Sequence, residues 1–316
     1  MQIKAADDKT PDLDVLRALL GRSDVNDEQR QRIDREIRNI QSGLRGEQDA
    51  AYEIEFHYGQ SRNWISIHDL RLECDGRVAQ IDHLLINRVL EIYVCESKRF
   101  AEGVAINEQG EFTAFFGGKA FGVPSPLEQN RRHISVLESV FKTGQVPLPR
   151  RLGLAIKPTM IGLVLVSKNA RISRPKRKIN GLDAVIKNDQ LKSRIDRDID
   201  ADNNPLGFAR LVSQDTLEEL ARAIASQHRP TRMDWLTKFG LPPVAPAPTP
   251  PKSPAPAPRP DPTGSSDPTR NKGKLVCAAC GVAVSYAVAK FCWVNKPRFA
   301  GLVYCMDCQR RVPKPP

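Results

Sequence analysis

A proline-rich stretch divides this chain of 316 residues into two parts. Between positions 241 and 270, about half of the chain's 25 prolines alternate with Ala, Thr and Ser. Proline fixes φ and lacks a backbone N–H, so such a stretch favours extended polyproline II segments over a packed core. We therefore predict a semi-rigid linker at 241–270, with a large folded part before it and a small module after it.

The charge composition indicates a polyanionic partner. The chain carries 48 Lys and Arg against 37 Asp and Glu, a net charge of +11, and its pI is about 9.4. A basic surface attracts nucleic acid and anionic membranes. No apolar run reaches the ~18 residues of a membrane span, and the acidic start does not resemble a signal peptide. We expect a cytoplasmic protein with nucleic acid as partner and no membrane contact.

The part before the linker is predicted to begin with helices. Two apolar stripes recur at the α-helical period: Leu13, Leu16 and Leu20, then Ile33, Ile37, Ile40 and Leu44. Gly, Ser and Asn between positions 21 and 26 favour a turn between two helices. We assign residues 1–42 to an N-terminal helical segment and residues 43–240 to the main domain.

The main domain contains both predicted strands and predicted helices. Stretches rich in Ile, Leu and Val predict strands at 64–74, 78–89, 90–100 and 160–166. A serine cap, a first-turn proline and a glutamate predict a helix from Pro126 to about Lys142. Residues 101–124 predict a loop or weak hairpin. A last amphipathic helix is expected near Leu217, with Trp235 and Phe239 packed against its end.

Two of the apolar strands carry charges that are expensive to bury without a purpose. Asp82 lies within one strand, and Glu96 and Lys98 lie at i and i+2 of the next, so these two side chains share a face. A single Glu-x-Lys is most often an ion pair on the surface of a sheet. An aspartate on one strand, Glu-x-Lys on the next and Gly46-Glu47 ahead of both favour a catalytic site instead.

These residue types match the needs of phosphodiester hydrolysis. The reaction needs oxygen ligands for Mg²⁺ or Mn²⁺, a polarised water and positive charge near the developing phosphorane. Asp82 and Glu96, with the backbone carbonyl of Ser97, are predicted to hold the metal. Lys98 is predicted to orient or activate the water and to offset negative charge, and Glu47 to support the metal or its water.

The order of four motifs resembles the nuclease-related domain (NERD) family of the PD-(D/E)XK nuclease superfamily. The motifs are Gly46-Glu47, Gln80-Ile81-Asp82-His83, Glu96-Ser97-Lys98-Arg99-Phe100, and Ser125-Pro126-Leu127-Glu128-Gln129-Asn130. They resemble the family's helical glutamate, metal-binding aspartate, Glu-x-Lys and helix-opening glutamine motifs, in that order. The resemblance covers roughly residues 43–167. It implies an α/β core with a central mixed sheet flanked by helices, and Mg²⁺-dependent cleavage of DNA in processing, repair or defence.

Further polar residues are candidates for nucleic-acid contact. Gln129, Arg132 and His133 share one face of the helix at 126–142. Gln129 is predicted to belong to the catalytic site, and Arg132 and His133 to contact nucleic acid, although a solvated polar face is the simpler alternative. The densest basic cluster of the main domain consists of Lys168, Arg171, Arg174, Lys176, Arg177 and Lys178. Its contacts to phosphates would be salt-sensitive and independent of sequence, and a solubilising loop is the alternative. His83 is predicted to point away from Asp82 as a satisfied neighbour.

Four of the seven cysteines predict a zinc site in a ribbon at 271–316. They form two C-x-x-C pairs, Cys277 with Cys280 and Cys305 with Cys308. This layout is typical of a tetrahedral Cys₄ zinc site, which so small a module needs in order to fold. Redox disulfides or an iron–sulfur cluster are the alternatives. Cys292, on a strand-like run, and Cys74 and Cys95 are predicted to be buried apolar residues.

The ribbon resembles those appended to topoisomerases, especially at Asn295–Gly301 before Tyr304 and Cys305. Lys296 and Arg298 are predicted to contact nucleic acid, and neighbouring aromatic rings suit either stacking on bases or the core of the module. The leading hypothesis is a metal-dependent nuclease whose ribbon raises the local concentration of DNA. The alternative is a non-catalytic DNA-binding or scaffold protein with a retained nuclease fold. The ribbon or the linker could also recruit a protein partner.

Overall fold

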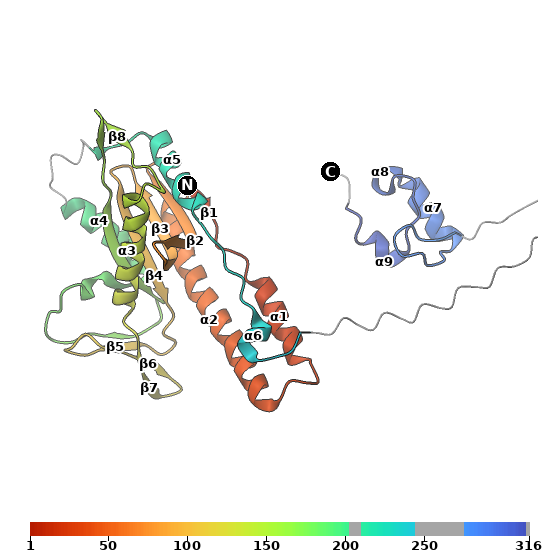
Figure 1. Ribbon diagram of the computed structural model, residues 1–316, viewed down its shortest axis with the longest axis horizontal. Coiled ribbons are helices and arrows are strands. Elements are labelled where there is room, and N and C mark those ends of the chain that lie inside the picture. The colour runs from red at the N-terminus through yellow and green to blue at the C-terminus, as the bar shows by residue number, and fades with distance from the viewer. Residues whose placement is uncertain (202–209, 244–274, 314–316) are drawn as a thin grey trace, which may run out of the picture. The chain divides into compact units, whose positions relative to one another are not determined.

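A computed structural model describes residues 1–201, 210–243 and 275–313 (Figure 1). The chain divides into two compact units, Met1–Ala245 and Pro246–Pro316. The predicted linker at 241–270 lies largely outside the described residues. Within those residues, no helix is both long and apolar enough to cross a membrane.

The N-terminal unit is built on a six-stranded sheet in the order β1-β2-β3-β4-β10-β12. The antiparallel strands are β2 (Trp64–Cys74), β3 (Arg77–Asn87) and β4 (Glu91–Lys98), and the parallel additions are β1 (Gln2–Lys4), β10 (Thr159–Val166) and β12 (Val185–Lys187). Asp75 and Gly76, with φ of 51° and 69°, form the tight turn between β2 and β3. The predicted mixed sheet is confirmed.

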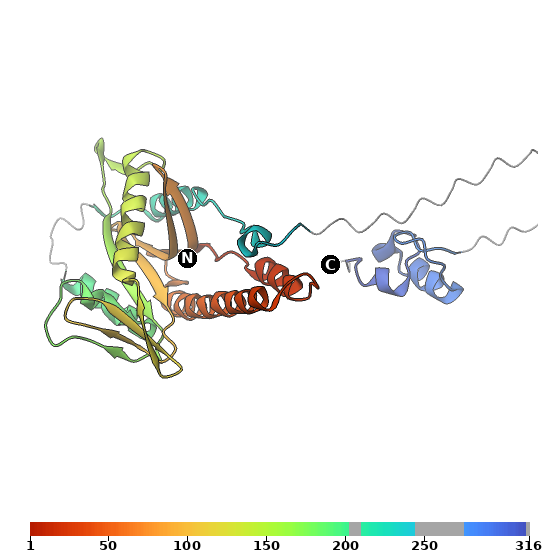
Figure 2. The ribbon, with the colours of Figure 1, turned by 60° about the horizontal axis from the view of Figure 1, so that its bottom comes forward.

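Helices cover both faces of this sheet (Figures 1 and 2). On one face, Leu84 and Ile86 belong to the core under α3 (Pro126–Lys142) and α5 (Gln214–Ser226). On the other face, Leu85 belongs to the core under α2 (Asp27–Tyr58) and α4 (Leu191–Ala201). Alternate residues of a strand face opposite sides, so burial on both sides requires an unbroken apolar run. The helix predicted at 126–142 is confirmed, with Ser125 as its cap.

One helix, α2, passes through both the predicted N-terminal segment and the main domain. Its 32 residues make it about 48 Å long. Its first half packs with α1 (Thr10–Leu20) and α6 (Trp235–Phe239) around a separate small core, and its second half covers the sheet. Trp235 and Phe239 belong to this small core, so the prediction that they pack against the end of α5 is wrong.

A second sheet, in the order β11-β5-β6-β7, follows the ends of β4 and β10 in the chain. Its strands are β5 (Val104–Ile106), β6 (Phe112–Phe116), β7 (Lys119–Val123) and β11 (Ile172–Ser173). Val104 and Phe112 pack against Val166 of the main sheet. The segment predicted as a loop or weak hairpin is therefore a three-stranded extension. Four of its five glycines, Gly103, Gly110, Gly117 and Gly118, occupy positive-φ positions beside and between the strands, which obscured the alternation of apolar residues.

Short elements complete both units. The N-terminal unit adds a hairpin, β8 (Arg150–Arg151) and β9 (Leu154–Ala155), and 3₁₀ turns at Leu182–Ala184 and Asn188–Gln190. The C-terminal unit contains α7 (Tyr286–Val294), α8 (Lys296–Phe299) and α9 (Met306–Gln309). Cys292 is fully buried, as predicted, but it lies on α7 and not on a strand. A short run of Ala, Val and aromatic residues has no clear period, so helix and strand cannot be told apart there.

Two glycines inside α2 differ in what a side chain would meet. A Cβ at Gly46 would lie 3.1 Å from the Cβ of Arg99, whereas at Gly43 the nearest atom is 3.8 Å away. Alanine is the better helix former by ~1 kcal/mol, so we expect Gly43→Ala to raise the free energy of unfolding by up to that amount. We expect no such gain for Gly46→Ala. Urea denaturation followed by circular dichroism measures the stability of both variants. Equal stabilisation by the two substitutions would show that α2 is not in close contact with Arg99 at the end of β4.

Candidate active site

The site lies where β3 and β4 separate. Their register runs as far as the pair His83–Cys95. Beyond that pair, the carboxylate of Asp82 accepts the backbone N–H of Ser97 at 2.7 Å. In a continued antiparallel ladder this N–H would bond to a carbonyl of the neighbouring strand. A side chain therefore replaces a ladder hydrogen bond and sets the spacing of the strands where they diverge.

Glu96 and Lys98 share a face of β4, as the strand period predicts. Lys98 Nζ donates to Glu96 Oε1 at 2.6 Å, and the Glu96 side chain is only 2% exposed. Its other oxygen lies 3.3 Å from His133 Nδ1 but without the geometry of a hydrogen bond, so it has no hydrogen-bond partner among the described residues. Leaving a buried carboxylate oxygen unpaired is costly, and a cation would remove that cost.

The helix α2 brings Glu47 to the same place. Gly46 allows α2 to lie close to Arg99, because a side chain at position 46 would meet the Cβ of Arg99. Glu47 is partly buried and, with Asp82, lines a cavity of about 300 Å³. The Gly-Glu pair therefore has two separable parts: the glycine allows the helix to approach, and the glutamate adds a carboxylate.

The carboxylates of the site repel one another. Burial raises the pKa of Asp82 well above its ordinary value, and the charges of Glu96 and Glu47 raise it further. The N–H of Ser97 and the charge of Lys98 oppose this rise. Burial likewise raises the pKa of Glu47. Excess negative charge in a partly buried site is the condition under which a bound cation is most favourable.

The segment before α1 contributes a second ammonium group. Lys9 Nζ lies 3.1 Å from Asp69 Oδ2, and its charge opposes the rise in the pKa of Glu47. Asp69 is buried, has φ of 52°, and also accepts hydrogen bonds from the Asp7 N–H and the Gln80 side chain. Neither Lys9 nor Asp69 was predicted. An aspartate inside the apolar strand β2 was the available signal for Asp69, whereas Lys9 belongs to no pattern.

A row of buried polar side chains lies beside the site. His83 Nδ1 is 2.8 Å from His68 Nδ1, and His83 Nε2 is 2.9 Å from the Ser97 hydroxyl. His68 Nε2 in turn lies 3.0 Å from a carboxylate oxygen of Glu55. Burial, and then the neighbouring His68, hold the pKa of His83 well below its ordinary value. This arrangement supports the interpretation of His83 as a satisfied neighbour, and it fixes Ser97 through its side chain.

The three polar residues predicted to share a face of α3 have different surroundings. His133 is buried beside Glu96, Gln129 is partly buried, and Arg132 is exposed. Asn130, for which the sequence predicted no role of its own, is buried, and its amide donates to backbone carbonyls of β4 and β10 at 2.8 and 2.9 Å. Asn130 therefore attaches the start of α3 to the two strands beside the site.

The predicted basic cluster lies after β10. Its members are all exposed: Lys168, Arg171, Arg174, Lys176, Arg177 and Lys178. Arg174 donates to the carbonyl of Val185, which orders this part of the segment. Arg171 immediately precedes β11 and so belongs to the second sheet. The cluster therefore begins close in the chain to the strand that neighbours Lys98.

In the C-terminal unit, the two cysteine pairs come together. The sulfur atoms of Cys277, Cys280, Cys305 and Cys308 all lie within 4.8 Å of one another. Tetrahedral zinc with bonds of ~2.3 Å requires sulfur atoms about 3.8 Å apart. Backbone N–H groups, that of Cys305 foremost, lower the pKa of Cys277 to about 6, which favours the thiolate that a metal needs. The cluster therefore fits the predicted zinc ribbon.

The two basic residues predicted to contact nucleic acid from the ribbon differ in their surroundings. The guanidinium of Arg298 donates to the carbonyls of Gln309 and Val312 at 2.7 and 2.9 Å and lies over the ring of Phe299. These contacts give Arg298 a structural role inside the unit. Lys296 is exposed. Among the aromatic rings, Phe299 is a core residue at 1% exposure, whereas Tyr286 is 68% exposed.

Comparison with known families identifies the domain. Residues 42–164 match the family model of the nuclease-related domain, and this range contains Glu47, Asp82, Glu96 and Lys98. No curated protein and no solved structure matches the chain. The chain therefore carries a nuclease-related domain, as its motifs predicted. The match indicates a nuclease-related function and interaction with nucleic acid.

Asp82 is expected to lower the stability of the metal-free protein. Its pKa is raised by folding, so the folded state binds more protons than the unfolded chain, and stability falls as pH rises from the ordinary aspartate value through the raised one. Asp82→Asn retains an acceptor for Ser97 and removes the charge. In EDTA at neutral pH we expect the variant to be more stable by ~1 kcal/mol, with the gain lost near pH ~4. Urea denaturation at both pH values tests this; a less stable variant at neutral pH would contradict it.

The cysteine cluster is expected to hold one zinc ion in the purified chain. Cys277→Ser removes a thiolate that four-sulfur coordination requires, so bound zinc measured by mass spectrometry should fall to near zero. Cys292→Ser is the matched control, because this buried thiol lies in the same unit but outside the cluster. Retention of zinc by Cys277→Ser, at the level of the control, would refute the assigned ligand set.

Proposed function

We propose that the nuclease-related domain is a metal-dependent nuclease that hydrolyses phosphodiester bonds of DNA. The observation that carries this proposal is the convergence of Glu47, Asp82 and Glu96 from three elements, with Lys98 bonded to one of them. The raised pKa values of Asp82 and Glu47, together with the unpaired oxygen of Glu96, support a site made for a divalent cation. A purely structural ion pair would need neither the crowding nor the excess charge.

Asp82 and Glu96 would hold Mg²⁺ or Mn²⁺, with the backbone carbonyl of Ser97 as a further oxygen and Glu47 in support. Carboxylate and carbonyl oxygens are the ligands that these hard cations prefer. When bound, the ion would supply Lewis-acid polarisation of a phosphate oxygen. The network through His83 keeps Ser97 in place, so that its carbonyl would not have to be reorganised on binding.

Lys98 supplies the positive charge that the protein itself brings to the reaction. Its ammonium is held by Glu96 at 2.6 Å, and Val166 of β10 is its neighbour across the sheet. In this position it would orient the attacking water and offset the charge that builds up on the phosphate. Preorganised charge of this kind is worth ~100- to 1000-fold in rate. Gln129, near the start of α3, is the candidate for a polar contact to the substrate.

The remaining basic residues would bind the DNA backbone. The exposed side chains at 168–178 and Lys296 of the ribbon suit phosphate contacts, which fall off steeply with salt. A zinc-loaded ribbon joined to the domain through the proline-rich stretch would raise the concentration of DNA near the domain without contributing to the chemistry. Arg298 is not part of this proposal for DNA contact, because its guanidinium bonds to backbone carbonyls within the unit.

Digestion of linear, circular and single-stranded DNA and of RNA, with and without Mg²⁺, tests the proposed activity. Lys98→Ala should lower the rate on DNA at least ~100-fold. Lys142→Ala is the matched control, because this exposed lysine at the end of α3 makes no side-chain hydrogen bond or ion pair with the described residues. If Lys98→Ala cut DNA as fast as the control, the assigned site would be wrong.

The metal assignment has a separate readout. Binding of Mg²⁺ to the folded state should raise the melting temperature of the parent protein. Asp82→Asn and Glu96→Gln should abolish this shift, whereas Lys98→Ala should keep it. A full shift in either carboxylate variant would place the ion elsewhere.

A further inference from the structure

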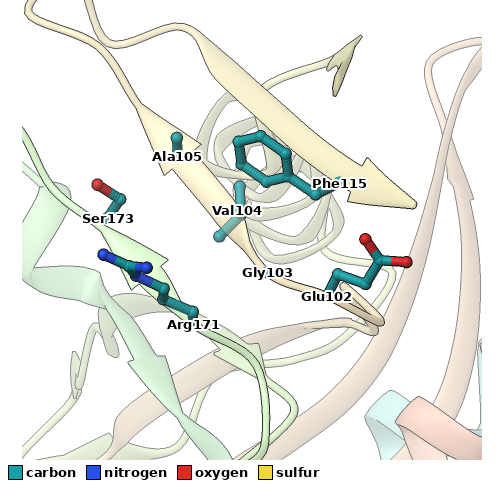
Figure 3. A pocket seen from close by; sticks show the side chains of 7 residues that line it. All are labelled: Glu102, Gly103, Val104, Ala105, Phe115, Arg171 and Ser173. Atoms are coloured by element: carbon teal, nitrogen blue, oxygen red, sulfur yellow. The ribbon is translucent and has the colours of Figure 1, made fainter. Parts of the chain in front are cut away.

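The outer face of the second sheet carries a trough with an aromatic wall and a cationic wall. The trough has a volume of about 420 Å³. Its lining includes Phe115 on β6, Ala105 on β5 and Ser173 on β11, together with Gly103 just before β5 and Arg171 just before β11. Figure 3 shows the Phe115 ring on one side of β5 and Arg171 and Ser173 on the other. Small residues therefore form the floor between two larger side chains.

The backbone explains why the floor is open. Phe115 N donates to Gly103 O at 3.2 Å, and Val104 N donates to Arg171 O at 2.8 Å, so Arg171, Gly103 and Phe115 form a row across three strands. Adjacent strands lie ~4.8 Å apart, which places the two walls about 10 Å apart. Gly103 has φ of 129°, and a Cβ there would lie 2.6 Å from Arg171 O. Only glycine fits at this position, so the centre of the row has no side chain.

The two walls suit the two parts of a nucleotide. The ring of Phe115 offers a stacking surface for a base, and stacking of this kind is independent of base identity. The Arg171 side chain is exposed and makes no hydrogen bond or ion pair with the described residues, so it is free to bind a phosphate. The other basic side chains of 168–178 add positive charge on the same segment. Bases inside a duplex are already stacked on one another, so the ring suits unpaired bases.

The trough lies close in the chain to the proposed cleavage site. Beyond the main sheet, Ser167 N still donates to Lys98 O at 3.2 Å, and β5 and β11 pair again a few residues later. An extended chain spans at most ~3.6 Å per residue, so Gly103 lies within about 18 Å of Lys98. The carboxylate of Glu102 accepts the N–H groups of Gly117 and Gly118, which fixes the hairpin that carries Phe115.

We propose that this trough binds single-stranded DNA beside the cleavage site, with a base on Phe115 and a phosphate on Arg171. The inference rests on the proposed nuclease function and specifies its substrate class. The preferred substrate has unpaired nucleotides next to the cut, as in an overhang or a frayed end, and intact duplex is a poorer substrate.

Fluorescence anisotropy of the full chain without added Mg²⁺ or Mn²⁺ tests this binding without cleavage, with a labelled oligothymidylate and a labelled duplex of equal length as probes. Phe115→Ala should weaken oligothymidylate binding about tenfold at every salt concentration. Phe115→Leu should do nearly the same while keeping the apolar bulk. Phe121→Ala is the matched control, because this exposed ring pairs with Ala114 and so faces the opposite side of the hairpin. It should leave binding unchanged.

Arg171→Ala should also weaken oligothymidylate binding and reduce the slope of log affinity against log salt by ~0.7, the value for one phosphate contact on a single strand. Lys142→Ala removes the same charge elsewhere and should not. Unchanged binding in Phe115→Leu and Arg171→Ala, or an equal loss for the duplex, overturns the proposal. Cleavage assays of Lys98→Ala decide the nuclease proposal separately, because the binding measurements contain no Mg²⁺ or Mn²⁺ and involve no chemistry.

Discussion

The geometry of the candidate site depends on the hydrogen bond between the Asp82 carboxylate and the Ser97 N–H. This bond stands where the ladder between β3 and β4 would otherwise continue, so it holds the two strands at the point of their separation. Ser97 is also fixed by its hydroxyl, through His83. Glu96 and Lys98 flank Ser97 in the chain, so the position of Ser97 also determines theirs. A single residue held from two directions thereby positions the charged groups on both strands.

The sequence predicted the parts of the molecule that depend on local pattern. The second half of β10, from Leu163 to Val166, is an unbroken apolar run because both of its faces are buried. The helix α3 begins at Pro126 because a serine cap and a proline coincide there. Asp82, Glu96 and Lys98 could be singled out because charge on a buried strand is expensive, which is a property of the strand alone. Four motifs in family order then connected these residues with Glu47, which no pattern of burial would have done.

The parts that the sequence did not predict depend on contacts between distant segments. Lys9 reaches the site only because β1, at the start of the chain, pairs with β2. Trp235 packs with α1 because α6 lies against the first half of α2. Strands of two or three residues, such as β11 and β12, are too short to show a period and exist through their partners. Asp69, like Asp82, is an aspartate within an apolar strand, but it belongs to none of the four family motifs.

The length of α2 has a mechanical consequence. One uninterrupted helix belongs to two cores, with Ile33 in the small bundle of α1 and α6, and Ile54 on the sheet. Glu47 lies between them, so one continuous helix joins the bundle to the carboxylate of Glu47. A ligand that tilted the bundle would change the position of Glu47 relative to Asp82 without touching either residue. The bundle is therefore a second place, distant from the site along α2, at which a bound ligand would affect the site.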